Sequence, residues 1–319
     1  MVRHAGATLT TDCPFLGMCC SQQQRCLVMA QWRVLDFQKY EGPIAARQGK
    51  LFAGERSVPL ADISTILTGP RCSLHASLLD RAAHFEIILL ACDWRGVPIS
   101  AALPWSSNTR VGARHAAQSQ LSEGRRKNAW MQLVKAKIAG QRANLHPESA
   151  AYRSLQRLQQ EVRSGDPSNT EAQAAKLYWK SVFLDEPGFV RDAAMSTDRN
   201  ALLNYGYTIL RGAVIRNIVA AGLWPTLGFW HHHRGNVFAL ADDLIEPFRP
   251  VVDHVVQGFS IDTELGDLGV RASLVASLDM PFATNGHTVG TMIMELAQTV
   301  GAYVEGEGTR LQVSSWRVA

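Results

Sequence analysis

Hydrophobic and polar positions follow two different patterns in the two parts of this 319-residue chain. Up to about residue 104, short apolar or alternating runs are broken by turn residues, as in QWRVLDF, KLFAG, VPLADISTILTGP and FEIILLACDWRGVPISAALP. Such runs, rich in Val, Ile, Leu and Phe and bounded by Gly and Pro, predict strands of a small sheet. One segment among them, CSLHASLLDRAAHF, has helical spacing at Leu74, Leu78, Leu79 and Ala82 and predicts a single short helix.

Beyond residue 108 the pattern becomes helical, with long segments rich in Ala, Leu, Gln, Arg and Lys, which are good helix formers. The segment ALLNYGYTILRGAVIRNIVAAGL is apolar on nearly every side, which predicts a central buried helix whose Arg211 and Arg216 need partners. The predicted fold is therefore α+β, with a small β-rich domain over 29–108 and a larger all-helical domain over 109–319.

Composition places the chain among folded globular proteins, with 46% hydrophobic and 19% charged residues. No run approaches the 18 or so apolar residues of a membrane span, and the first twenty residues lack the apolar core of a secretory signal. We therefore expect a cytoplasmic protein with no membrane partner. Residues 1–28 hold four cysteines without a C-x2-C pair, and we predict that this extension is not part of the fold and that Met29 is the true start.

The net charge of +4 is mild, but basic residues concentrate between positions 110 and 142. A single acid, Glu123, lies within this block. Such a block suits the phosphates of a nucleic acid, and it is equally typical of a solvated helix face. The basic residues are Arg110, Arg114, Arg125, Arg126, Lys127, Lys135, Lys137 and Arg142.

Two stretches carry candidate chemistry. In GDPSNTEAQAAKLYW, residues 165–179, Glu171 lies at the start of a predicted helix, where with Ser168 it fits an S-x-x-E capping box. The second stretch, GFWHHHRGNVFALADDLIEPFRP, places three histidines ahead of three carboxylates. Adjacent side chains of an extended segment point in opposite directions, so at most one or two of the three histidines can reach one metal ion.

The acidic part of this stretch predicts a helix that kinks or begins near Pro247. Asp243 and Glu246 are three residues apart and share a helical face, whereas Asp242 points elsewhere. Glutamate and histidine together with further oxygen donors suit Mg²⁺ or Mn²⁺.

Residues 200–253, from NALLNYGYTIL to IEPFRPVVD, closely resemble the core of the CRISPR-associated integrase family Cas1. The segment DPSNTEAQAAKLYW resembles the family's stretch around a metal-binding glutamate. The segments VLDF, VPLADISTIL and LLACDWRGVPISAALPW resemble its N-terminal β-domain, so the likeness runs from about Met29 to about Asp253. Its character suggests the subtype that accompanies RNA-guided nucleases with a single large effector.

The resemblance implies a site for Mg²⁺ or Mn²⁺ made by Glu171, His231 and Glu246, with His231 chosen for its spacing to Glu246. It also implies an assisting role for Asp243. Relatives more often have two histidines followed by Arg-Asn, so the triplet of this chain keeps His232 as an alternative ligand.

The implied activity is metal-dependent integration during CRISPR adaptation. The 3′-hydroxyl ends of captured double-stranded DNA would be joined to CRISPR repeat DNA by transesterification. The implied assembly is a homodimer, formed through the β-domain, that works with the small adaptation protein Cas2. Two alternatives remain: a metal-dependent endonuclease acting on branched or free DNA, and a non-catalytic DNA-binding scaffold.

Overall fold

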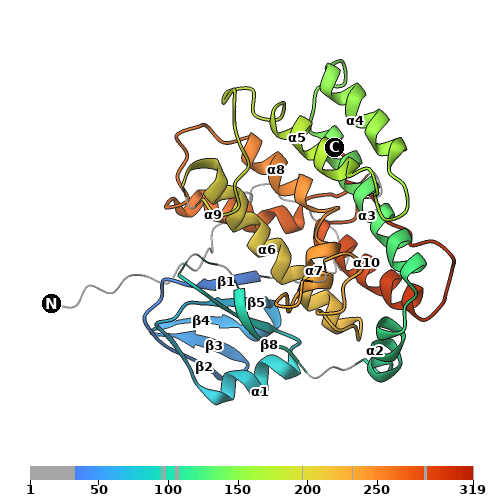
Figure 1. The fold of residues 1–319 in the computed structure, drawn as a ribbon. Helices are drawn as coiled ribbons and strands as arrows, with labels where there is room; N and C mark the ends of the chain where they lie inside the picture. Colours follow the sequence, from blue (N-terminus) through green and yellow to red (C-terminus); the bar gives the residue numbers. More distant parts are fainter. Residues whose placement is uncertain are drawn as a thin grey trace, which may run out of the picture. The chain divides into compact units, whose positions relative to one another are not determined.

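The computed structural model describes residues 33–94, 96, 98–104, 108–195, 197–231, 233–283 and 286–318. The predicted extension 1–28 lies outside this part of the chain. The chain divides into two compact units, Met1–Ala102 and Leu103–Ala319, so the division comes a few residues before the boundary expected after 108. The first unit is rich in strands and the second is helical, which confirms the predicted α+β class (Figure 1).

The described residues of the first unit form two four-stranded sheets where the sequence predicted one. One sheet has the order β1-β5-β7-β8 and the other the order β4-β3-β2-β6. The first sheet consists of β1 Arg33–Phe37, β5 Ile63–Thr68, β7 Ile88–Cys92 and β8 Pro98–Ala102. The second consists of β2 Gly42–Arg47, β3 Lys50–Ala53, β4 Arg56–Pro59 and β6 Cys72–Leu74.

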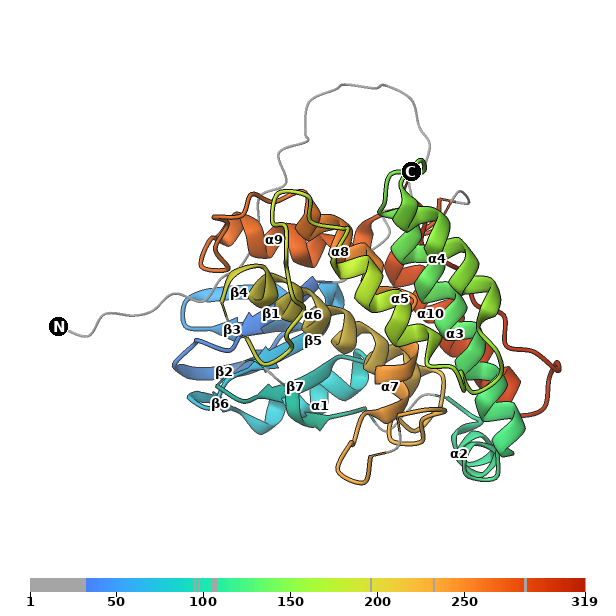
Figure 2. The same cartoon turned by 45° about the horizontal axis from the view of Figure 1, so that its top comes forward.

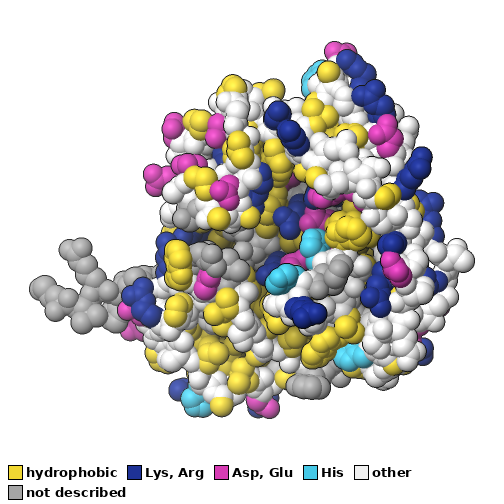
Figure 3. All heavy atoms as spheres, in the orientation of Figure 1, with side chains coloured by type: hydrophobic (Ala, Val, Ile, Leu, Met, Phe, Trp, Pro, Cys, Tyr) yellow, Lys and Arg dark blue, Asp and Glu magenta, His cyan; other side chains and the backbone are white. Residues whose placement is uncertain are grey.

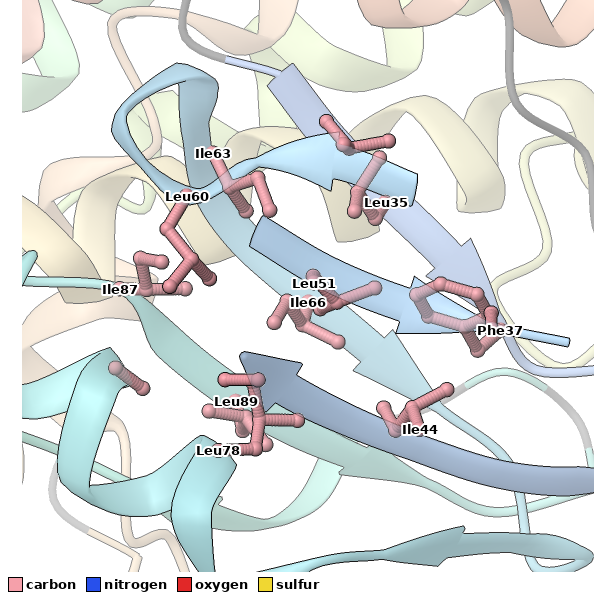
Figure 4. Close-up of a cluster of buried hydrophobic side chains, with 14 residues drawn as sticks. Leu35, Phe37, Ile44, Leu51, Leu60, Ile63, Ile66, Leu78, Ile87 and Leu89 are labelled. Atoms are coloured by element: carbon pink, nitrogen blue, oxygen red, sulfur yellow. The ribbon is translucent and has the colours of Figure 1, made fainter. Parts of the chain in front are cut away.

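A single hydrophobic core joins the two sheets (Figure 4). Leu35 and Ile66 of the first sheet, Ile44 and Leu51 of the second, and Leu78 of the helix α1 (Ala76–His84) are buried in it. Alternation along β2 and β3 directs one face of each strand into this core, as the side-chain period of two requires. A short 3-10 helix, η1 Leu60–Asp62, leads into β5 and buries Leu60.

The expected helix over 72–85 is correct only from Ala76 onward. Leu74, expected on the buried face of the helix, is instead on β6 and is exposed. Leu79 is also exposed, whereas Leu78 and Ala82 are buried as the helical spacing predicts. β6 is three residues long and pairs with β2, so its strand state depends on a distant partner, which local spacing does not encode.

The second unit is built around the long helix α6 Asp198–Ala220, which contacts α7, α8, α9 and α10. Most of its residues are buried, as predicted, and Arg211 finds its partner in Asp242. The remaining described helices are α2 Val111–Ser119, α3 Glu123–Ala143, α4 Ala150–Glu161, α5 Thr170–Trp179, α7 Ala239–Leu244, α8 Arg249–Gln257, α9 Leu268–Ala276, the 3-10 turn η2 Ser277–Asp279 and α10 Val289–Val304.

Helices α3, α4 and α5 lie side by side in both cartoon views (Figures 1 and 2). The acidic stretch is split into α7 and α8 by a turn over residues 245–248, which confirms the break expected at Pro247. The site described below is thus carried by α3, α5, the segment before α7, and the α7–α8 turn.

Candidate metal centre

Two of the predicted metal ligands converge on one buried cation. The ammonium of Lys137, on α3, forms ion pairs with Glu171 at the start of α5 and with Glu246 in the α7–α8 turn. The distance from Lys137 Nζ to Glu246 Oε2 is 2.6 Å, and the side chains of Lys137 and Glu246 are only 11% and 6% exposed. The two carboxylates therefore share a single positive charge.

Glu171 is free for this role because another residue caps its helix. The amides of Thr170 and Glu171 each donate to a carboxylate oxygen of Asp166, at 2.9 Å. Through these two hydrogen bonds the carboxylate of Asp166, a residue with a positive φ of 42°, caps the first turn of α5. The capping-box alternative for Glu171 is therefore wrong. The backbone carbonyl of Ser168 instead accepts a hydrogen bond from the side chain of Gln173.

Glu246 is held in its charged form by two cations. Burial by itself would raise the pKa of Glu246, but the charges of Arg249 and Lys137 outweigh it, and the net effect lowers the pKa. Arg249 Nε lies 3.1 Å from Glu246 Oε1, so each carboxylate oxygen faces a different positive group. Lys137 has the reciprocal balance: burial lowers its pKa, and the charges of Glu246 and Glu171 more than reverse this.

The histidine run is positioned by Asp243, on α7. Asp243 Oδ2 accepts the amides of Phe229 and Trp230, while Oδ1 accepts the amide of His231 at 3.1 Å and lies 2.8 Å from its Nδ1. Asp243 is fully buried. Gly228 makes this approach possible, since a Cβ at that position would lie 2.8 Å from Asp243 Oδ2. Both oxygens of Asp243 are thus engaged by the segment that carries His231, and the carboxylate orients the imidazole.

This hydrogen bond determines which ring nitrogen of His231 can bind a ligand. When Nδ1 donates to Asp243, the lone pair of Nε2 is left for an ion. The hydrogen bond also raises the pKa of His231, against the lowering effect of burial, and the charge of Glu246 adds to the rise. Trp130 packs its ring edge-to-face against His231 and stacks on Trp230, which further fixes the imidazole.

The remaining candidates in this stretch are His232, His233 and Asp242. His233 is exposed and its Nδ1 accepts the amide of Gly235. His232 lies outside the described residues. Asp242, predicted to point elsewhere, pairs with Arg211 at 2.8 Å and accepts a hydrogen bond from Asn236.

Two buried tyrosines belong to a hydrogen-bonded network next to Arg249 and Glu246. Tyr178 of α5 and Tyr207 of α6 both donate hydroxyl protons to Asp253 of α8. Arg249 stacks over the ring of Tyr207, 4.7 Å from its centroid, and so joins this network to Glu246. Three helices that carry or border the site are thereby fixed to one another. Sequence reasoning missed these residues, because helix-buried tyrosines carry no local pattern that marks them.

The donor set suits a divalent ion. Glu246 Oε2 is buried, and its contact with Lys137 lacks hydrogen-bond geometry, so no hydrogen bond from the described chain satisfies it. A buried carboxylate oxygen of this kind, beside a second carboxylate and an oriented imidazole, fits Mg²⁺ or Mn²⁺. As they stand, no three His, Cys, Asp or Glu side chains of the described residues form a metal-binding group.

Acidic, basic and histidine side chains gather near the middle of the face drawn in Figure 3, beside a group of hydrophobic ones. The structure distributes the predicted basic block over several internal contacts. Arg110 and Arg114 pair with Glu305, and Arg125 lies over the ring of Tyr303, 4.1 Å from its centroid. Lys127 pairs with Glu123 on the same helix.

Two members of the predicted phosphate track need correction. Arg114 is buried and donates to the carbonyl of Ala221, and the side chain of Lys137 is only 11% exposed and lies against the two glutamates. Neither side chain is at the surface. Arg114 donates to a backbone carbonyl inside the helical unit, and Lys137 pairs with carboxylates there. Arg110, Arg126, Lys127 and Lys135 retain at least part of their exposure.

The family model described as "CRISPR associated protein Cas1" matches residues 44–265, more than half of the chain. The chain belongs to the Cas1 family. The CRISPR-associated endonuclease Cas1 of Neisseria meningitidis serogroup C is 35% identical to it over an alignment of 258 positions, which covers 77% of this chain and 83% of that protein. The expected family membership is confirmed.

Solved structures support the same fold for this Cas1-family chain. A casposase bound to integration product has a TM-score of 0.71 at 19% identity, covering 88% of this chain and 92% of that one. A chain of a Cas6-RT-Cas1–Cas2 complex also has a TM-score of 0.71, at 18% identity, covering 91% of this chain and 36% of that one. In the described part of this chain, every helix is too short or too polar to cross a membrane.

Proposed function

We propose that this chain is a metal-dependent DNA integrase of CRISPR adaptation. The observation that carries the proposal is the convergence of Glu171 and Glu246 on one buried cation, with His231 oriented beside them by Asp243. The proposed ligands of one Mg²⁺ or Mn²⁺ are Glu171, His231 through Nε2, and Glu246. Proteins similar to this chain include a CRISPR-associated endonuclease and a casposase, which supports a nucleic-acid substrate.

The proposed reaction is a transesterification. The 3′-oxygen of a captured DNA end forms a new bond to a phosphorus atom at the edge of a CRISPR repeat. The bond from that phosphorus to its original bridging oxygen breaks, the attacking hydroxyl gives up its proton, and the departing oxygen takes up a proton to leave as a free hydroxyl. A bound divalent ion would lower the pKa of the attacking hydroxyl and neutralise charge on the phosphate oxygens.

The chain's own residues set up this chemistry before DNA arrives. Asp243 and Trp130 fix the imidazole of His231, and Asp166 fixes the first turn of α5, so that Glu171 needs little further ordering. Arg249 keeps Glu246 ionised. The exposed members of the basic block, Arg110, Arg126, Lys127 and Lys135, are proposed to hold phosphates along the approach.

The proposed partners follow from the family. A structure similar to this chain is part of a Cas1–Cas2 complex, which supports a small Cas2 partner here. We further propose a homodimer formed through the strand-rich unit. The proposed substrates are double-stranded DNA with 3′ ends and CRISPR repeat DNA, handled in the cytoplasm.

A second candidate function is cleavage of branched or free DNA, with water in place of the 3′-hydroxyl. The Neisseria meningitidis relative is named an endonuclease, which favours this second function. The same residues serve both reactions, so the two are separated by products. A 3′-end joining assay on repeat-containing DNA, with and without the Cas2 partner and in Mg²⁺ or Mn²⁺, should give branched joined products. Shortened strands without joining would favour the endonuclease.

Single substitutions test the ligand set in the same assay. Glu171→Ala, His231→Ala and Glu246→Ala should each abolish joining, because each removes one of three ligands, while dimerisation and most DNA binding remain. His233→Ala is the matched control and should stay active, since His233 is exposed and bonded only within its own turn. Activity in His231→Ala together with loss in His232→Ala would shift the ligand by one residue. Full activity of Glu171→Ala would overturn the proposed metal site.

A further inference from the structure

Lys137 occupies a position where a lysine is costly unless it is paired. Its side chain is 11% exposed, and the chain surrounds it with the carboxylates of Glu171 and Glu246. Removing an ammonium from water is expensive, and only close opposite charges compensate for it. The net rise in the pKa of Lys137 shows that these charges outweigh the burial.

The charges at this point are balanced without any further ion. Lys137 and Arg249 supply two positive charges, and Glu171 and Glu246 supply two negative ones. Both oxygens of Glu246 already face a cation, Arg249 at Oε1 and Lys137 at Oε2. A divalent ion on the same carboxylates would lie within a few ångströms of the ammonium, where like charges repel strongly.

Of the two cations, Lys137 is the one that can leave. Arg249 is fixed by stacking over Tyr207, which is in turn hydrogen bonded to Asp253. Lys137 has a flexible four-carbon stem, and its ion pairs are with the two carboxylates that would bind the ion.

We propose that Lys137 is an internal counter-cation that competes with the divalent ion, so that the ion binds as the Lys137 ammonium withdraws from Glu171 and Glu246. This proposal rests on the ligand set proposed above. By neutralising the two glutamates, Lys137 holds them together and lowers the affinity of the site for metal.

The test measures Mn²⁺ binding directly, by the loss of the free Mn²⁺ signal in electron paramagnetic resonance. In the Lys137→Met variant, Mn²⁺ should bind about tenfold more tightly or better, comparable with the roughly 5- to 150-fold changes that coupled groups usually exert on one another's binding. Lys176→Met is the matched control: Lys176 is exposed near the end of α5, and its removal should leave Mn²⁺ affinity unchanged.

Thermal unfolding supplies a second readout. In chelator, Lys137→Met should melt below the wild type, because the buried carboxylate of Glu246 and the partly exposed carboxylate of Glu171 lose their shared cation. Added Mn²⁺ should raise its Tm by more than it raises that of the wild type, since tighter binding stabilises the folded state more. A lysine with a structural role alone would lower Tm by the same amount at every Mn²⁺ concentration.

The outcomes separate the two proposals. Equal or weaker Mn²⁺ binding by Lys137→Met, while Glu246→Gln abolishes binding, would overturn the exchange and leave the ligand set intact. Mn²⁺ binding that Glu171→Gln and Glu246→Gln do not alter would overturn the ligand set itself. Lys137→Gln serves as the second variant. Failure of both lysine variants to fold even in Mn²⁺ would count against the proposal, because the ion should replace the missing charge.

Discussion

At the scale of single residues, Asp243 has the clearest indirect role. Its carboxylate gathers three successive amides and the Nδ1 of His231, so a single side chain fixes both the loop and the tautomer. The carboxylate lies three residues before Glu246, which is why the sequence gives it the appearance of a ligand.

We expect Asp243→Asn to weaken Mn²⁺ binding and joining by about 10- to 100-fold, the usual cost of losing a residue that orients a ligand. The amide would present a donor to backbone N–H groups and release the imidazole. The neighbouring Asp242→Asn is the control, because the carboxylate of Asp242 is engaged by Arg211 and Asn236. Equal losses in the two variants would contradict the orienting role. Mn²⁺ titration and the joining assay provide the measurements.

Asp253 makes the stability of the protein depend on pH. Burial raises the pKa of its carboxyl from 3.8 to about 6, although Tyr207, Tyr178 and the nearby arginines act in the opposite direction. As the pH rises between these two values, the unfolded chain loses this proton while the folded chain keeps it. The carboxyl therefore destabilises the fold by up to about 3 kcal/mol above pH 6, and this penalty disappears toward pH 4.

The prediction is checked by urea unfolding of the wild type and Asp253→Asn across this pH range. The stability of the wild type relative to the variant should fall as the pH rises from about 4 to about 7, and then level off. A difference that does not change with pH would show that the carboxyl titrates alike in the folded and unfolded chains.

At the scale of elements, the helical unit depends on close approaches that small residues allow. Gly206 of α6 lies against Val252 of α8, and a Cβ at this position would come within 2.5 Å of Val252 Cγ1. Because α8 also carries Arg249 and Asp253, this contact sets the distance between α6 and the back of the site.

We expect Gly206→Ala to destabilise the protein by about 1–3 kcal/mol, as overpacking of a dense core does. Gly124→Ala, in the first turn of α3 with open space around it, is the control. That change should be neutral or stabilise by up to about 1 kcal/mol through helix propensity. Chemical denaturation of both variants measures the effect, and a harmless Gly206→Ala would mean that α8 can shift without cost.

At the scale of the whole molecule, DNA affinity should come from the exposed part of the basic block. Gln substitutions at Arg126 and Lys127 together should lower the salt slope of DNA binding by about 2, at about 0.9 per lost phosphate contact. A double Gln variant at Lys39 and Lys50, exposed on the strand-rich unit, changes the net charge equally and should leave the slope unchanged. Fluorescence anisotropy at several salt concentrations gives both slopes. Equal slopes for the two variants would favour the alternative interpretation, in which the basic block is a solvated helix face.

The sequence by itself determined the change from strand to helical pattern, the buried central helix and the break at Pro247, because each depends on local periodicity or on the rigid geometry of proline. The resemblance in its motifs named Glu171, His231 and Glu246 as a set. Only the tertiary structure showed that Asp243 orients His231, that Asp166 caps the helix that begins near Glu171, and that Lys137 pairs with two carboxylates. The partners of Lys137 lie on other helices far along the chain, and burial turned a basic residue predicted for the surface into an internal cation. Contacts of this kind follow from how helices pack, and spacing along one segment does not encode them.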